Sequence, residues 1–75
     1  MRSQSVRLVF PPNLHDEPVI NRLLRRYSFT VNILGANVTA EEGWMDIQIT
    51  GKAAEIESSF SWLRDQGIEI ILMTN

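Results

Sequence analysis

Residues 30–50 read TVNILGANVTAEEGWMDIQIT, a stretch with two strand-like runs on either side of a turn. The first run, Thr30–Val38, is interrupted by Gly35, and a glycine inside a strand usually marks a bulge or a close backbone approach. The second run, Trp44–Thr50, alternates between two faces. One face holds Met45, Ile47 and Ile49, and the other holds Trp44, Asp46, Gln48 and Thr50. Residues 40–43 supply the turn, so the stretch predicts a β-hairpin.

A strand and a helix are expected before the hairpin. Gln4–Phe10 alternates like a half-buried strand, and Pro11-Pro12 ends it because proline cannot donate to a strand ladder. Asp16 is then a good helix N-cap, with Pro18 in the first turn of the helix that follows. The apolar face of this helix is expected to hold Val19, Ile20, Leu23, Leu24 and Tyr27.

A second helix and a last strand are expected after the hairpin. Gly51 opens the helix, which runs to Gln66 and ends at Gly67, because glycine readily takes the left-handed conformation that closes many helices. The helix start is expected to be weakly capped, since Lys52 follows the glycine. The buried stripe of the helix is Ala53, Ile56, Phe60 and Leu63. The last strand covers Ile68–Met73, with Ile68, Ile70 and Leu72 on one face.

The resulting order, βαββαβ, predicts an α+β fold with one domain over residues 1–75. Two crossover helices on one side of a sheet are typical of the ferredoxin-like split βαβ arrangement. Right-handed crossovers then predict a four-stranded antiparallel sheet with strand order 4-1-3-2 and both helices on one face.

Length and composition restrict the possible functions. The chain has 75 residues, a net charge of −2 and no cysteine. A chain this short buries only about 60% of its unfolded surface, so association with a second copy or a partner would add stability. The negative net charge argues against nucleic acid as the main partner. The absence of cysteine excludes disulfides, thiolate metal sites and iron–sulfur ligation.

No segment of the sequence has the pattern of a membrane span or a signal peptide. No apolar run approaches the roughly 18 residues that a spanning helix needs. The first residues, Met1–Gln4, carry a charge but are not followed by the apolar core of a signal peptide. A cytoplasmic protein is therefore expected.

The sequence shows no convincing active site. His15 is the only histidine and falls on an expected loop, whereas a catalytic triad or a metal site needs several converging groups. Four candidate carboxylates are spread over a turn, a strand and a helix cap; they are Asp16, Glu41, Glu42 and Asp46. The glycines lack the spacing of a phosphate-binding loop. The expectation is a protein that is not an enzyme, with no catalytic residues, no metal site and no cofactor.

Three segments resemble the NIL domain family, which is found at the C-terminus of methionine-importer ATPases and also occurs fused to ferredoxins or alone. Asn32-Ile33-Leu34 resembles the motif that gives the family its name. Residues 8–10 with 17–20 (LVF and EPVI) resemble its opening strand and helix start, and residues 63–69 (LRDQGIE) resemble its closing segment. Together the segments span about residues 5–73, the core of a single NIL-like domain.

The resemblance implies a regulatory domain that pairs with its twin, binds methionine and restrains transport when this amino acid is plentiful. The matching ligand-binding region is Asn32, Ile33, Leu34, Gly35, Ala36 and Asn37. Its chemistry is suitable, because oriented amides can hold a zwitterion while an apolar slot accepts a thioether. On this interpretation the ligand is a small amino acid and the protein is a homodimer.

Other interpretations of the same residues stay open. Asn32 is also compatible with a strand residue that faces solvent, which is the more common case. The helical arginines form either a solvated face or a docking surface for an acidic partner; they are Arg22, Arg25 and Arg26. Trp62, on the flank of the second helix, is either a half-buried packing residue or an interface anchor.

An apolar outer surface is expected on the sheet. Its residues are Val9, Leu34, Trp44, Ile71 and Met73. Surfaces of this kind usually meet a partner. A second copy would make a homodimer with these residues in the interface, and a different protein would make the chain an adaptor that docks on a transporter or a ferredoxin-type redox protein. A monomer with a less apolar sheet face is the remaining alternative, since a register error around Gly35 would move its neighbours to the other side.

Overall fold

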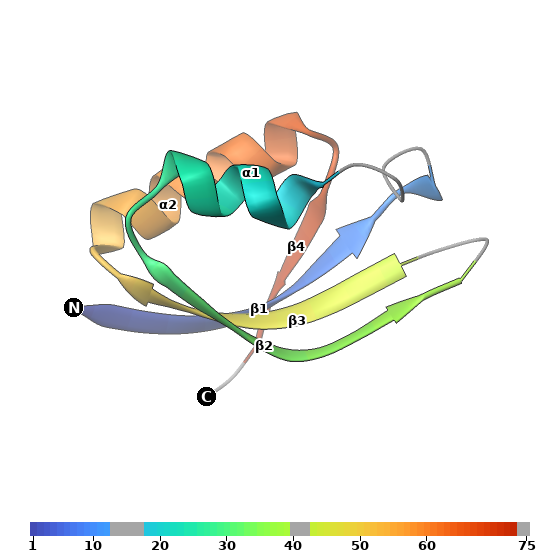
Figure 1. Cartoon of the computed structure of the whole chain (residues 1–75), viewed down its shortest axis with the longest axis horizontal. Coiled ribbons are helices and arrows are strands. Elements are labelled where there is room, and N and C mark those ends of the chain that lie inside the picture. The colour runs from blue at the N-terminus through green and yellow to red at the C-terminus, as the bar shows by residue number, and fades with distance from the viewer. Residues whose placement is uncertain (13–17, 40–42, 74–75) are drawn as a thin grey trace.

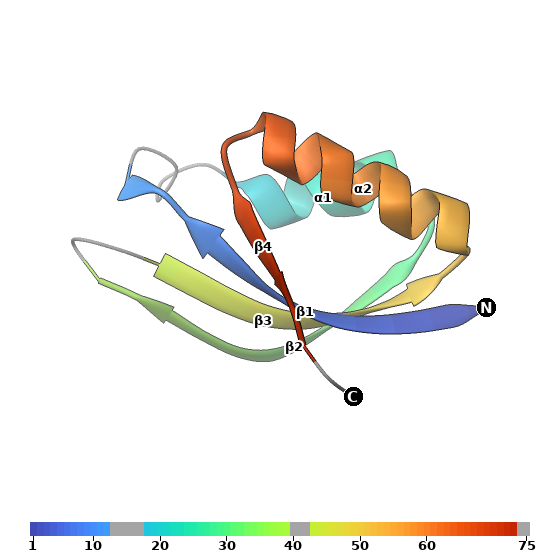
Figure 2. The same cartoon turned by 180° about the vertical axis from the view of Figure 1, so that it is seen from behind.

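The computed structural model describes residues 1–12, 18–39 and 43–73, and these residues form a four-stranded sheet covered on one face by two helices (Figure 1). The elements are β1 (Arg2–Phe10), α1 (Val19–Arg26), β2 (Thr30–Val38), β3 (Gly43–Gly51), α2 (Ala53–Asp65) and β4 (Glu69–Leu72). Seen from behind, both helices again lie above the sheet (Figure 2). The predicted α+β, ferredoxin-like arrangement is confirmed.

The sheet has the order β2-β3-β1-β4, and all neighbouring strands are antiparallel. This is the predicted order 4-1-3-2 seen from the other edge. The central pair runs the full length of both strands, from Arg2 opposite Gly51 to Phe10 opposite Gly43. The shorter strand β4 pairs only with Val6–Val9 of β1. The two edges of the sheet are therefore β2 and β4.

The register of β2 against β3 shifts by one residue in the middle of the strand. Ile33 lies opposite Ile47 and Gly35 lies opposite Asp46, so Leu34 is the extra residue of a β-bulge. Of the two alternatives predicted for Gly35, a bulge or a close backbone approach, the structure shows a bulge, at the residue before the glycine. Because side chains alternate between faces, the extra residue changes which side chains of β2 share a face.

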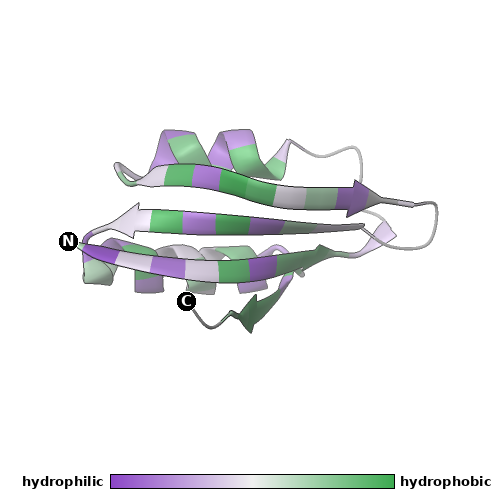
Figure 3. Ribbon diagram, turned by 90° about the horizontal axis from the view of Figure 1, so that it is seen from below, coloured by the Kyte–Doolittle hydropathy of each residue, from purple (hydrophilic) through white to green (hydrophobic). Residues whose placement is uncertain are grey.

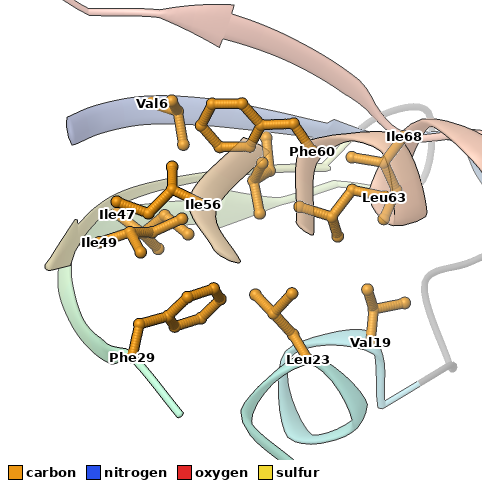
Figure 4. Packing of buried hydrophobic residues seen from close by; sticks show 11 residues of the cluster. Val6, Val19, Leu23, Phe29, Ile47, Ile49, Ile56, Phe60, Leu63 and Ile68 are labelled. Carbon is orange, nitrogen blue, oxygen red and sulfur yellow. The ribbon is translucent and has the colours of Figure 1, made fainter. Parts of the chain in front are cut away.

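The core lies between the sheet and the two helices (Figure 4). Side chains from β1, α1, β3 and α2 meet there, together with two residues that directly precede β2 and β4; the buried set is Val6, Leu8, Val19, Leu23, Phe29, Ile47, Ile49, Ile56, Phe60, Leu63 and Ile68. Figure 4 shows Val19, Leu23 and Phe29 facing the side chains of α2 and the sheet. Full burial of one such side chain contributes about 1.5–3 kcal/mol, so this cluster carries most of the stability of the fold.

Helix α2 ends in a complete Schellman motif. Gly67 takes a left-handed conformation with φ of 90°. Its N–H donates to the Arg64 carbonyl at 2.9 Å, and the Ile68 N–H donates to the Leu63 carbonyl at 3.1 Å. Ile68 and Leu63 are both buried, which provides the apolar contact that accompanies this motif. The prediction that Gly67 closes the helix is confirmed.

Helix starts depart from the predictions in detail. Gly51 belongs to the end of β3, and α2 begins at Ala53 after Lys52, whose side chain makes no capping hydrogen bond. Pro18 occupies the N-cap position of α1, rather than a place within its first turn. The predicted cap at Asp16 and the turn residues 40–42 lie outside the described residues.

Three residues assigned to apolar stripes are exposed. Leu24 is 45% exposed, because the eight-residue helix α1 packs through Val19 and Leu23 and turns Leu24 toward its flank. Ala53 is exposed in the first turn of α2. Further along this helix, Ser59 belongs to the buried stripe in its place. Leu72 is 63% exposed because it ends an edge strand that has a neighbour on one side only.

Candidate functional site

The face of the sheet opposite the helices is uncovered, and we call it the open face (Figure 3). The buried apolar residues of the sheet point toward the helices, so the residues that alternate with them point to the open face. By register these are Ser3, Ser5, Arg7 and Val9 of β1, Thr30, Asn32, Gly35 and Asn37 of β2, Trp44, Asp46, Gln48 and Thr50 of β3, and Glu69 and Ile71 of β4. Met73 continues past β4, and its N–H donates to the Ser5 carbonyl at 2.9 Å.

An ion pair lies at the centre of the open face. Arg7 of β1 lies directly opposite Asp46 of β3. The Arg7 Nε donates to Asp46 Oδ1 at 2.7 Å, and Nη2 donates to Oδ2 at 3.0 Å, so the pair is bidentate. The side chain of Arg7 is 40% exposed, whereas that of Asp46 is only 12% exposed. The pair therefore presents its guanidinium to solvent more than its carboxylate.

The two charges stabilise each other's ionised form. Hydrogen bonding from Arg7, helped by its positive charge, lowers the pKa of the Asp46 carboxyl below its ordinary value although partial burial opposes the shift. The hydrogen bond to Asp46 likewise raises the pKa of Arg7. Both groups are consequently charged at neutral pH.

Trp44 completes this cluster. The guanidinium carbon of Arg7 lies 4.2 Å from the centroid of the indole, within range of a cation–π interaction. A Cβ built on Gly35 would lie 3.8 Å from the indole Cζ3, so the ring reaches across to β2 at the glycine. We call Arg7, Asp46 and Trp44 the open-face cluster. It combines a fixed positive group, a fixed negative group and an aromatic surface.

The structure divides the predicted ligand-binding residues between two sides. Asn32, Gly35 and Asn37 lie on the open face, opposite Gln48, Asp46 and Trp44 respectively. Ile33 and Ala36 lie opposite Ile47 and Met45, whose side chains belong to the helix-facing side. Leu34 is the bulged residue without a register partner. Ile33 is 56% and Leu34 53% exposed, at the free edge of the sheet. The region therefore supplies two amides beside the open-face cluster, while Ile33 and Ala36 lie on the other side of the strand.

The predicted interface residues all lie on the open face, apart from the bulged Leu34. Ile71 is 45% exposed, and Val9, Trp44 and Met73 are half-buried. The apolar surface expected from these residues is interrupted, because Arg7 lies between them and brings Asp46 with it. The open face is thus a mixed surface with an ion pair at its centre.

Sequence reasoning missed the Arg7–Asp46 pair. The sequence places Asp46 on the polar face of its strand and among four dispersed carboxylates, and Arg7 lies in the alternating run Gln4–Phe10 with no signal of its own. The available signal was that opposite charges fall on the same face of two strands that the fold makes neighbours. Matching the apolar partners Leu8 and Met45 would have placed the two charges opposite each other.

The helix layer also has a surface that combines aromatic and basic side chains. The guanidinium carbon of Arg26 lies 6.0 Å from the ring centroid of Tyr27 and 5.9 Å from that of Trp62. Trp62 is half-buried against the core, as expected for a packing residue on the flank of the helix. Arg22 and Arg25 are exposed.

Two kinds of feature are not found in the described part of the chain. Residues 1–12, 18–39 and 43–73 contain no group of three or more histidine, cysteine or acidic side chains placed to hold a metal ion. Neither helix within these ranges has the length and apolar character needed to cross a membrane.

The chain belongs to the NIL domain family, since the sequence model of the NIL domain matches residues 4–71. An uncharacterized protein of Synechococcus elongatus is 32% identical over 73 residues, which cover 93% of this chain and 90% of that protein. A methionine import ATP-binding protein of Helicobacter pylori is 31% identical over 74 residues, which cover 92% of this chain but only 23% of the importer protein.

The fold agrees with this family assignment. The crystal structure of the C-terminal domain of an ABC transporter ATP-binding protein from Enterococcus faecalis matches with a TM-score of 0.79 and 25% sequence identity. The match covers 96% of this chain and 84% of that domain. The chain therefore resembles a segment of a methionine import ATP-binding protein in sequence, and the C-terminal domain of an ABC transporter ATP-binding protein in fold.

Proposed function

We propose that this chain is a non-catalytic regulatory domain that binds a small amino acid, with methionine as the leading candidate. The observation that carries the proposal is the near-complete match between this chain and a segment of methionine import ATP-binding proteins. A small domain within a methionine import protein suits sensing of the transported molecule. We expect it to act in the cytoplasm, where the ATP-binding subunit of an importer meets its nucleotide.

The open face supplies suitable chemistry for such a ligand. Asn32 and Asn37 are exposed amides on this face, and each offers both donors and acceptors to a zwitterion. Val9, Ile71 and Trp44 offer apolar area for a thioether side chain. A second copy placed over the same face would cover a bound ligand, so we also propose a homodimer with the open face in its interface.

Calorimetry and thermal unfolding with methionine and a panel of other amino acids, each at millimolar concentration, test the proposal. A ligand at 100 times its dissociation constant stabilises the folded state by about 2.7 kcal/mol, which thermal unfolding detects. The variant Asn32→Ala should weaken binding, whereas Asn21→Ala, which removes an exposed amide from α1, should leave it unchanged. Absence of heat and of thermal shift across the whole panel would refute amino-acid binding.

A second candidate function is favoured by the edge strand β4. Ile71 and the neighbouring Leu72 are 45% and 63% exposed, an unusual apolar exposure for an edge of four residues. A protein-interaction adaptor would use this strand to dock on a transporter subunit or a redox protein. Pull-down with a tagged chain should then lose the partner for Ile71→Asp and keep it for Glu69→Gln, a matched exposed position on the same strand. Equal recovery with both variants would remove β4 as the docking site.

A further inference from the structure

The central ion pair of the open face has unused binding capacity. Arg7 donates to Asp46 through Nε and Nη2, and within the described ranges no group accepts a hydrogen bond from its third nitrogen, Nη1. Each oxygen of Asp46 accepts one of these bonds, while a carboxylate oxygen can accept two. Among the described residues the pair is thus a fixed dipole with an unused donor nitrogen and spare acceptor sites.

The rows of the sheet on either side of this pair differ in polarity. On one side the next cross-strand pair of the open face is Val9 with Trp44, and on the other side it is Ser5 with Gln48. Glu69 of β4 lies beside Val9, and Met73 lies beside Ser5. A ligand held on the ion pair would therefore find the aromatic surface of Trp44 in one direction only. This asymmetry fixes the orientation of a ligand whose charged end and apolar end differ.

We propose that the Arg7–Asp46 pair recognises the two charged groups of a zwitterionic α-amino acid, with Arg7 Nη1 donating to its carboxylate and Asp46 accepting from its ammonium. The side chain of the ligand then lies over Val9 and Trp44, which suits an unbranched apolar or thioether group. The inference rests on the proposed amino-acid binding and assigns its charge recognition to residues outside the Asn32–Asn37 region.

Stacking of Arg7 on Trp44 supports this role. The indole at 4.2 Å and the bidentate bonds to Asp46 hold the guanidinium in one orientation before any ligand arrives. Little side-chain entropy is then lost on binding, which favours the binding of a small ligand. The side chain of Asp46 by contrast is only 12% exposed. The ligand ammonium can therefore reach it only when the ligand carboxylate lies on the Arg7 side of the pair.

Titration calorimetry on the full chain with three probes measures separately how much the ammonium and the carboxylate of the ligand contribute to binding. The probes are L-methionine, N-acetyl-L-methionine, which lacks the ammonium, and L-methioninol, which lacks the carboxylate. We expect the parent chain to bind each analogue at least about tenfold more weakly than methionine, since hydrogen bonds to charged groups are lost. Asp46→Asn should abolish the preference over the acetylated probe, and Arg7→Gln should abolish the preference over methioninol.

Thr50→Ala is the matched control. It breaks the Ser3–Thr50 hydroxyl contact of 2.9 Å, another cross-strand pair of β1 and β3 on the same face, and should keep all three affinities. If Asp46→Asn and Arg7→Gln retain the parent preferences, charge recognition by this pair is refuted while amino-acid binding stands. If the parent chain binds none of the three probes and no other amino acid, the proposed function itself fails.

A charge-swapped double variant, Arg7→Asp with Asp46→Arg, guards against loss of folding in the single variants. It keeps an opposite-charge pair but reverses the dipole, so a bound zwitterion would point its side chain toward Ser5 and Gln48. We expect methionine affinity to fall at least about tenfold in a folded chain, judged by its cooperative thermal unfolding. Parent-like affinity in the swapped variant would overturn the proposal.

Discussion

Gly51, at the end of β3, lies directly against Phe29, which precedes β2: a Cβ built on Gly51 would stand 2.6 Å from the Phe29 Cβ and 3.3 Å from its Cα. No ordinary side chain fits at that distance. The missing Cβ lets the backbone at Phe29 approach the sheet closely enough for the phenyl ring to enter the core, where it is 6% exposed. Figure 4 shows this ring between the sheet and Leu23.

Gly51→Ala is therefore expected to destabilise the fold. The added methyl must push Phe29 and its backbone away from the sheet, and overpacking of this kind costs about 1–3 kcal/mol. Urea unfolding followed by circular dichroism gives the change in free energy. Gly35→Ala is the control, because a Cβ there meets only the Trp44 ring at an ordinary 3.8 Å and should change stability by less than about 0.5 kcal/mol. Equal effects of the two substitutions would contradict the close approach at Gly51.

Gly67→Ala should also destabilise the chain, but for a conformational reason. A Cβ on Gly67 meets nothing within 4 Å, so no steric contact with the rest of the protein opposes it. The cost comes from the left-handed φ of 90°, about 1–2 kcal/mol for a residue with a side chain. Gly67→Asn should cost less, because asparagine tolerates this conformation better. If alanine and asparagine cost the same in urea unfolding, backbone conformation is not the cause.

The stability of the fold should depend on pH through Asp46. Its pKa is lowered in the folded chain by the hydrogen bonds from Arg7, so the folded state binds a proton less readily than the unfolded state. The stabilisation is present above the unfolded pKa of about 3.9 and is lost as pH falls through the lower folded value. The parent chain should therefore melt at a higher temperature than Asp46→Asn at pH 7, and the gap should close below about pH 4.

Glu57→Gln is the control for this pH series. Glu57 is exposed on α2, and the described structure gives it no hydrogen bond or ion pair. Its removal should change the melting temperature little at any pH. If the difference in melting temperature between the parent chain and Asp46→Asn is still as large at pH 2, the asparagine destabilises the fold by disturbing the packing. Loss of the ion pair would then not be the cause.

Much of the fold could be predicted because its elements carry local signals. The alternation in Trp44–Thr50, the prolines after Phe10 and the glycine at position 67 each act within a few residues, and the structure agrees with all three. Helix packing is less local. Leu24 has the correct spacing for the core, yet whether it is covered depends on how the short helix α1 is rolled on the sheet.

The open face shows what local signals cannot supply. Asn32 and Asn37 are five positions apart, so simple alternation would place them on opposite faces. They share the open face because Leu34 is inserted as a bulge, and only the pairing with β3 fixes the position of that bulge. The Arg7–Asp46 pair depends in the same way on the register of two strands that are 39 residues apart in the chain.

The last prediction concerns the oligomeric state. Sedimentation equilibrium at micromolar concentration should give a mass twice the 8.6 kDa of one chain. A domain this small gains stability by burying its uncovered sheet face, where Val9, Trp44, Ile71 and Met73 surround the ion pair. Burial of Arg7 with Asp46 is tolerable because the two charges enter the interface already paired and hydrogen-bonded.

Two substitutions of equal exposure locate the interface. Ile71 on the open face and Leu24 on α1 are each 45% exposed, so an aspartate at either position removes a similar apolar surface. Ile71→Asp should convert the dimer to a monomer by placing a charge inside the contact, whereas Leu24→Asp should leave the dimer intact. Dissociation by Leu24→Asp alone would place the interface on the helix side. A single 8.6 kDa species of the parent chain, with no dependence on concentration, would refute the dimer and any ligand site shared between two open faces.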